Sequence, residues 1–205
     1  DAIIEERDAT KEQKRINEVN SGILAIKSTF IKKLLPEIKN KNAAKEYYLT
    51  DIVSIAKKHG IKVRPLLLED RDEALGANTP IELQDLERAY QRIKAKKLVN
   101  SGVNIADIDR IDSRGSLTVG KGSFIDVNNV FIGCVEIGKN TQIGPNCYIK
   151  DSVIGDGVAL QTSTVIEDSR VGDLCKLGPF ARIRGGTEIE GNAELGNFVE
   201  ANRSK

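Results

Sequence analysis

The stretch VGKGSFIDVNNVFIGCVEIGKNTQIGPNCYIK, residues 119–150, carries a large apolar residue at every sixth position. At the 40% apolar background of the chain, six such residues in a row would occur by chance about 0.4% of the time. The frame then shifts by one residue, and later shifts a second time. The fourteen positions of this repeat are Val119, Ile125, Phe131, Ile137, Ile143, Ile149, Ile154, Leu160, Val165, Val171, Leu177, Ile183, Ile189 and Leu195.

A period of six fits neither a helix of 3.6 residues per turn nor a simple alternating strand. It fits a chain that turns a corner every six residues and points one apolar side chain inward from each face. Three faces make one coil, and stacked coils make a parallel β-helix. Residues 119–205 would supply between four and five coils. The alternative is a β-sandwich with glycine turns, whose turns usually recur at roughly 8–12 residues.

Glycine divides the chain, because four of the 18 glycines lie in residues 1–110 and the other 14 follow. The first part is mixed α/β in pattern. We expect short buried strands at 20–26 and 61–68 and helices at 28–35 and 43–59. A longer helix should begin after the cap formed by Thr79 and Pro80, run to about residue 99 and stop at Gly102.

Composition excludes several classes of function. Formal charge is 31 − 30 = +1, so no strong basic field favours a nucleic-acid partner. No apolar run approaches the ~18 residues of a membrane span, and the N-terminal stretch has no apolar signal-peptide core. Three cysteines without metal-ligand spacing suggest reduced thiols and a cytoplasmic protein. Because methionine is absent even from position 1, we expect a fragment or a processed piece.

Five strings taken together resemble one enzyme family. They are NSGILAIK (20–27), EYYLTDI (46–52), LGANTPIELQDLERAYQ (75–91), GPFARIR (178–184) and LGNFVE (195–200). The family is the bacterial bifunctional N-acetylglucosamine-1-phosphate uridyltransferase and glucosamine-1-phosphate acetyltransferase. The resemblance implies an α/β fold class followed by a left-handed parallel β-helix of hexapeptide repeats. It implies three segments: the C-terminal part of a Rossmann-like uridyltransferase domain (1–78), a linker helix (79–102), and the first part of the β-helix acetyltransferase domain (103–205).

The same resemblance implies a cytoplasmic enzyme that makes UDP-N-acetylglucosamine, a precursor of peptidoglycan and lipopolysaccharide. Acetyl-CoA would donate its acetyl group to glucosamine-1-phosphate. UTP would then donate its uridylyl group to the sugar phosphate, with Mg²⁺ as cofactor. A homotrimer is implied by the family, and it also follows from a prism whose flat faces and open edges need covering. Small sugar phosphates and nucleotides are the expected partners, with no nucleic acid and no membrane.

Residues of the uridyltransferase site carry over one by one from the resemblance. Glu5, Asn20, Tyr48 and Thr50 match sugar-pocket positions, and Asn78 matches an asparagine that holds substrate and the catalytic metal with an upstream aspartate. An amide oxygen suits Mg²⁺, which prefers hard oxygen ligands. From the residues alone, without the resemblance, we would interpret Glu5 as a solvated surface residue, Tyr48 as a core residue and Asn78 as a helix cap.

Arg184 and Asn202 match positions of the acetyltransferase acceptor site. A guanidinium fork suits a phosphate, so Arg184 is expected to bind the sugar phosphate. The sequence departs from the family pattern at two positions: Gly185 stands where a proline is usual, and Asn202 stands where a lysine is usual. An asparagine supplies no cation. Either the neighbouring Arg203 compensates, or acceptor binding is weakened.

No catalytic residue is expected within this chain. By resemblance the phosphate loop, an early lysine and the metal aspartate would precede Asp1, and the histidine base would follow Lys205. His59 reads as a surface residue. We therefore expect the chain alone to catalyse neither reaction. Two other functions stay open: another sugar nucleotidyltransferase with a β-helix tail, or a non-catalytic trimeric β-helix scaffold.

Overall fold

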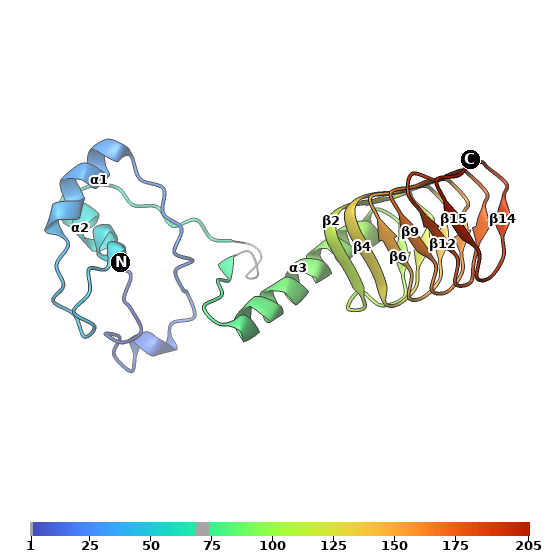
Figure 1. Ribbon diagram of the computed structural model, residues 1–205. Coiled ribbons are helices and arrows are strands. Elements are labelled where there is room, and N and C mark those ends of the chain that lie inside the picture. The colour runs from blue at the N-terminus through green and yellow to red at the C-terminus, as the bar shows by residue number, and fades with distance from the viewer. Residues whose placement is uncertain (1, 69–73) are drawn as a thin grey trace. The chain divides into compact units, whose positions relative to one another are not determined.

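A computed structural model describes residues 2–68 and 74–205, and it contains two compact units (Figure 1). Contacts divide the chain between Leu75 and Gly76, so the first unit holds the short helices and the second holds the long helix with every strand of the described residues. The segment boundaries inferred from the family stay predictions. No helix in the described ranges is both long and apolar enough to cross a membrane.

The first unit is built from short helical segments around a small core. Its buried residues are Leu34, Ile38, Ile52, Ile55 and Ala56, which come from both of its α-helices and the segment after the first. Its helices are η1 (Gln13–Arg15), α1 (Ser28–Leu34), η2 (Leu35–Glu37), η3 (Leu49–Asp51) and α2 (Ile52–Lys58).

The prediction of two strands in this unit is wrong. Residues 20–26 and 61–68 form no strand, although both are rich in β-branched and aliphatic side chains. Ile23, Leu66 and Leu67 are exposed by 75%, 88% and 85%. A strand exists only when a second strand pairs with its backbone, and no described segment of this unit pairs with either stretch.

The helix expected at 43–59 is much shorter than its pattern, because only α2 and the preceding η3 are helical. The side chain of Asn42 explains the loss. Its Oδ1 accepts from the Glu46 backbone N–H at 3.1 Å, and its Nδ2 donates to the Glu46 carbonyl at 2.5 Å. Lys45 inside this turn has a φ of 55°. An asparagine side chain that bonds nearby backbone groups competes with helix formation.

The long helix α3 (Pro80–Asn100) confirms the expected start and stop. Thr79 Oγ1 accepts from the Glu82 backbone N–H at 3.3 Å, and Glu82 reaches back to the Thr79 N–H at 3.2 Å, which makes a capping box. Gly102, with a φ of 95°, follows the end. Gln91 ties the helix to the first long strand, because its amide donates to the Ser113 carbonyl and accepts from the Ser113 N–H.

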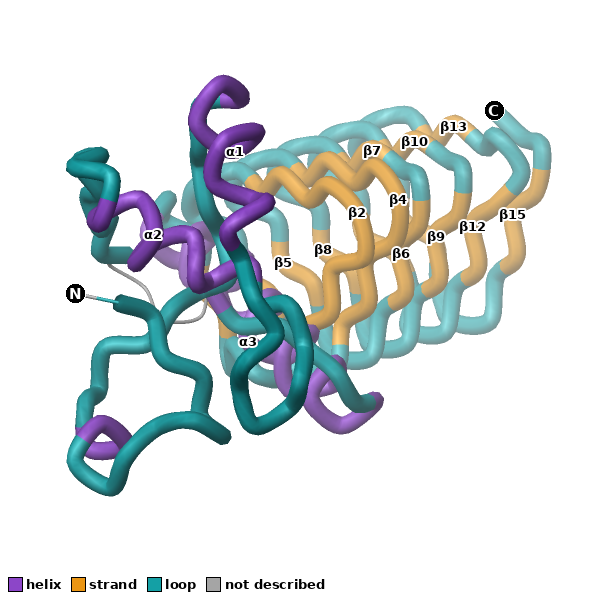
Figure 2. The backbone as a smooth tube through the Cα atoms, turned by 90° about the vertical axis from the view of Figure 1, so that its left-hand side faces the viewer, coloured by secondary structure: helices purple, strands orange, loops and turns teal. Residues whose placement is uncertain are grey.

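The second unit continues as a parallel β-helix of about six turns (Figure 2). One face is a sheet of six strands, ordered β1-β3-β5-β8-β11-β14. The other two faces form one nine-stranded sheet, because β2 and β4 are long enough to turn the corner between them. The strands are β1 (Asn104–Ile105), β2 (Ile111–Val119), β3 (Phe124–Ile125), β4 (Asn129–Ile137), β5 (Gln142–Ile143), β6 (Tyr148–Lys150), β7 (Val153–Ile154), β8 (Ala159–Leu160), β9 (Val165–Glu167), β10 (Arg170–Val171), β11 (Lys176–Leu177), β12 (Arg182–Arg184), β13 (Glu188–Ile189), β14 (Glu194–Leu195) and β15 (Glu200–Asn202).

Strand pairing gives the length of each coil. Ile125 pairs with Ile143, which lies three times six positions further along the chain. Ile143 pairs with Leu160, one position short of a full coil, whereas the step from Leu177 to Leu195 is a full coil again. Three faces of six residues, shortened by one in the middle coils, produce this pattern. The expected β-helix fold class is therefore confirmed.

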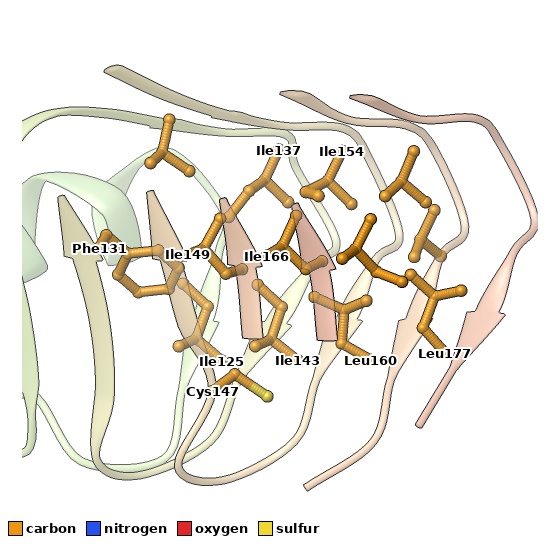
Figure 3. Close-up of a cluster of buried hydrophobic side chains, with 14 of the residues drawn as sticks. Ile125, Phe131, Ile137, Ile143, Cys147, Ile149, Ile154, Leu160, Ile166 and Leu177 are labelled. Carbon is orange, nitrogen blue, oxygen red and sulfur yellow. The ribbon is translucent and has the colours of Figure 1, made fainter. Parts of the chain in front are cut away.

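The core of the β-helix is a column of mainly aliphatic side chains inside the coils, with Phe131 and Cys147 among them (Figure 3). Ile125, Ile143 and Ile149 are completely buried, as the period of six predicts. One position is corrected: Ile166 is completely buried, whereas Val165 is only half-buried. The second one-residue shift therefore falls after Ile166, between it and Val171.

Corners of the coils use the left-handed backbone region. Asn146 has a φ of 61°, Ser163 of 55° and Asp168 of 48°. Each of these residues stands three positions before an inward side chain. Asparagine and aspartate tolerate this conformation better than most residues, whereas β-branched residues avoid it. The corner residues thus set which side chains face the core.

Candidate functional site

Three of the residues assigned to the uridyltransferase pocket lie close together in the first unit. The Thr50 hydroxyl donates to Glu5 Oε1 at 2.8 Å, although the two residues are far apart in the sequence. Tyr48 precedes η3, and its pKa is raised, first by desolvation and then by the carboxylates of Asp8, Glu46 and Glu5. This group of side chains offers hydroxyls and a carboxylate, which suit the hydroxyls of a sugar.

No hydrogen bond within the described residues joins Asn20 to this group. Asn20 is exposed in the segment before α1. Asn78 belongs to the second unit, where it precedes the cap of α3 and its backbone N–H donates to Glu82 Oε2 at 2.6 Å. The helix cap is Thr79, so the alternative that Asn78 is the cap is wrong.

Chemistry around Asn78 gives only partial support for a metal. Its exposed side-chain oxygen is a hard ligand of the kind that Mg²⁺ takes. Among the described residues, however, no group of three His, Cys, Asp or Glu side chains could hold a metal ion. A magnesium ion at Asn78 would therefore need its other ligands from elsewhere, such as nucleotide phosphates.

The two residues predicted for the acetyltransferase acceptor site lie side by side on neighbouring coils. Strand β12 pairs with β15 in parallel, and Arg184 is the ladder partner of Asn202. Arg184 Nε donates to Glu200 Oε1 at 2.7 Å. This hydrogen bond is the main reason that the pKa of Glu200 lies below its usual range. The carboxylate occupies one edge of the guanidinium and leaves the terminal nitrogens for another anion.

Gly185 lies directly after Arg184 and has a φ of 70°. Proline locks φ near −65°, so the backbone here excludes the residue that the family would place at this position. A Cβ on Gly185 would overlap Asn202 Oδ1 and would lie 3.3 Å from Arg203 Cγ. The two departures recognised in the sequence are thus in contact.

Sequence reasoning missed Glu200 as a member of this site. The signal was present, since a coil made of three six-residue faces places Arg182 opposite Glu200 and Arg184 opposite Asn202. A carboxylate on the neighbouring coil is then within reach of either arginine. The spacing of the repeat could have identified it.

The remaining reactive side chains form no second site in the described ranges. His59 is on the surface and its Nε2 lies 2.7 Å from Glu37 Oε1. The three cysteines are free thiols, of which Cys134 is exposed while Cys147 and Cys175 are buried. Burial raises the pKa of Cys147 to about 11.

Comparison with known proteins gives matches to both parts of the chain. Residues 109–204 match the family model described as GMPPB C-terminal domain. A protein of Marinobacter nauticus named Bifunctional protein GlmU is 47% identical over 203 residues, which are 99% of this chain and 45% of that protein. A protein of the same name from Ruthia magnifica subsp. Calyptogena magnifica is 42% identical over 203 residues, again 99% of this chain and 45% of the relative. The chain therefore spans a little under half the length of these curated relatives.

Proposed function

We propose that the chain forms part of an enzyme that makes UDP-N-acetylglucosamine, because homology along 99% of its length confirms the resemblance to the bifunctional GlmU family. The observation that carries the proposal is the 47% identity over both units of the chain. The β-helix alone would not select this function, because its family model is named for a different protein. Identity across the first unit as well favours the bifunctional enzyme over another nucleotidyltransferase or a scaffold.

In the first reaction, the amine nitrogen of glucosamine-1-phosphate attacks the carbonyl carbon of acetyl-CoA. The amide bond forms, the thioester bond breaks, and coenzyme A leaves with the proton that the amine loses. The part of this chain in that step is to bind the acceptor. Arg184 holds the phosphate through its terminal nitrogens, because a guanidinium and a phosphate can form two parallel hydrogen bonds.

In the second reaction, the phosphate of N-acetylglucosamine-1-phosphate attacks the α-phosphorus of UTP, and pyrophosphate leaves. Glu5 and Thr50 bind sugar hydroxyls, with Tyr48 and Asn20 near the same pocket. Asn78 would contribute one oxygen ligand to Mg²⁺, which would neutralise phosphate charge when bound. This assignment is supported by the 2.8 Å bond between Thr50 and Glu5, which brings two of the assigned residues together.

Assembly and location follow from the same proposal. The enzyme is a cytoplasmic homotrimer that acts on small sugar phosphates, acetyl-CoA and UTP, without nucleic-acid or membrane partners. Free thiols in the described ranges and a net charge of +1 support this assignment. Sedimentation of the chain at micromolar concentration tests the trimer, and a stable monomer would contradict it.

We expect this chain alone to catalyse neither reaction, because the resemblance assigns binding residues to it and no catalytic group. The decisive experiment therefore exchanges segments. The whole of this chain replaces the matching 203 residues of the Marinobacter nauticus protein, and both reactions are measured. We expect both activities to persist.

A matched control makes the exchange interpretable. The corresponding segment of the Ruthia relative, which is 42% identical to this chain, is placed in the same host protein. If the control hybrid is active and the hybrid with this chain is folded but inactive in both reactions, the proposed function is wrong. Turnover by the isolated chain would contradict the inactivity of the chain alone.

A further inference from the structure

Around Gly185, two arginines from neighbouring coils approach the same small area. Arg184 precedes the glycine in β12, and Arg203 follows β15 on the next coil. The Arg203 backbone N–H donates to the Arg184 carbonyl at 3.5 Å. The Arg203 Cγ lies 3.3 Å from where a Gly185 Cβ would stand, so the stem of this side chain passes over the glycine.

The other basic side chains of β11, β12 and the segment 200–205 are paired with carboxylates. Arg182 lies 3.7 Å from Glu167 and Lys205 lies 3.0 Å from Glu188. Arg184 gives its Nε edge to Glu200 at 2.7 Å. Arg203 is exposed and has no ion pair within the described residues. Its guanidinium group can therefore bind an anionic ligand.

We propose that Arg203 is the second cation of an anion site whose first cation is Arg184, and that the missing side chain of Gly185 admits it. The ligand class is a phosphate monoester, whose two negative charges and several acceptor oxygens suit two guanidinium groups. This inference rests on the proposed function for the sugar part of the ligand, but not for the phosphate. Asn202, which directly precedes Arg203 in the sequence, supplies no charge.

Glu200 determines which edge of Arg184 the ligand meets. Its carboxylate accepts from Nε, and neither terminal nitrogen of Arg184 has a hydrogen bond to a described residue. A phosphate bound there is held on one side by Arg184 and on the other by Arg203. Removing the charge of Arg203 should weaken binding without changing the fold, because the side chain is exposed.

Binding is measured by calorimetric titration of the full chain with inorganic phosphate and with glucosamine-1-phosphate. Arg203→Gln should raise both dissociation constants about tenfold, the usual scale for one charge-assisted hydrogen bond. Lys205→Gln is the matched control, because it removes one positive charge from a nearby position in the same terminal segment. It should change either constant by less than about twofold.

The role of Gly185 is tested with a pair of glycines. Gly185→Ala and Gly186→Ala both place alanine at a positive φ, but only the first meets Asn202 and the Arg203 stem, since nothing lies within 4 Å at Gly186. Gly185→Ala should weaken phosphate binding roughly fivefold more than Gly186→Ala. Adding Asn202→Ala should restore part of that loss. Circular dichroism reports whether each variant is folded.

The outcomes separate this inference from the proposed function. Equal effects of Arg203→Gln and Lys205→Gln overturn the inference, as does the absence of phosphate binding to the unchanged chain. The inference is also overturned if glucosamine-1-phosphate binds more tightly than phosphate but Arg203→Gln changes neither dissociation constant. The proposed function stands in that case. Binding of phosphate that depends on Arg203 but gains nothing from the sugar supports the inference and contradicts the proposed acceptor.

Discussion

Truncation of Ile166 tests the inward register of the β-helix more sharply than any other change. Ile166 is completely buried, whereas its neighbour Val165 is half-buried. Ile166→Ala removes three carbon atoms, worth about 2.4 kcal/mol at roughly 0.8 kcal/mol per buried methylene. The cavity left in a column that cannot collapse adds to this value, so we expect a total loss of about 3–4 kcal/mol.

Val165→Ala is the matched control, because it lies next to Ile166 in the same strand and on the opposite side of the backbone. It removes two carbon atoms from a side chain that is already partly in water. The expected loss is below about 1 kcal/mol.

Urea unfolding followed by far-ultraviolet circular dichroism measures both variants. Stacked coils can unfold in steps, so the comparison uses the transition of the β-helix and requires equal slopes in the two variants. If Val165→Ala costs as much as Ile166→Ala, the corrected register is wrong and the spacing read from the sequence alone is right.

Three further changes test other parts of the structure. Arg184 lowers the pKa of Glu200, so this ion pair stabilises the fold at pH values above 4.5, the ordinary pKa of the carboxyl group. The stabilisation is lost as the pH falls through the lower pKa of Glu200 in the folded chain. The melting temperatures of the unchanged chain and Glu200→Gln should therefore converge in acid. Thr79→Ala removes the capping box of α3 and should cost about 1 kcal/mol in thermal unfolding, whereas Thr79→Ser should cost little. Iodoacetamide at pH 8 followed by mass spectrometry should label exposed Cys134 well before buried Cys147, whose pKa is raised to about 11; equal labelling in the folded chain would contradict the described burial.

The β-helix was predictable from sequence because its geometry repeats with a fixed number of residues. A face of six residues places one side chain inward, and Ile125, Ile143 and Ile149 obey this without exception. The period fails only where two adjacent apolar residues compete for one inward place, at Val165 and Ile166. Periodicity alone cannot choose between them.

The type of residue at the corner does distinguish between these two registers. At Asn146 and Asp168 the residue three positions before an inward side chain has a positive φ, and the corresponding residue is Ser163 if Ile166 is inward. Were Val165 inward, the corner would fall on Thr162, whose β-branched side chain avoids that backbone region. A register assigned from corners and period together would have been correct.

The first unit was less predictable, because its local pattern depends on partners elsewhere. The sequence of 61–68 has strand propensity, but hydrogen bonds from a neighbouring strand decide whether a strand forms. Within 43–59, the local bonds of Asn42 to Glu46 override helical spacing. Propensity and periodicity describe one segment at a time, so both errors have the same origin.

The candidate acetyltransferase site shows why position-by-position comparison is insufficient. Gly185 and Asn202 are nearly a whole coil apart in the sequence and read as two independent departures from a family pattern. In the β-helix they lie on neighbouring coils, where a side chain at 185 would overlap Asn202 Oδ1. A proline cannot adopt the φ of 70° seen at 185, so restoring the family residue there would demand a different corner and a different place for Asn202. The two substitutions therefore form one structural feature, and restoring one family residue without the other should weaken the site more than restoring both.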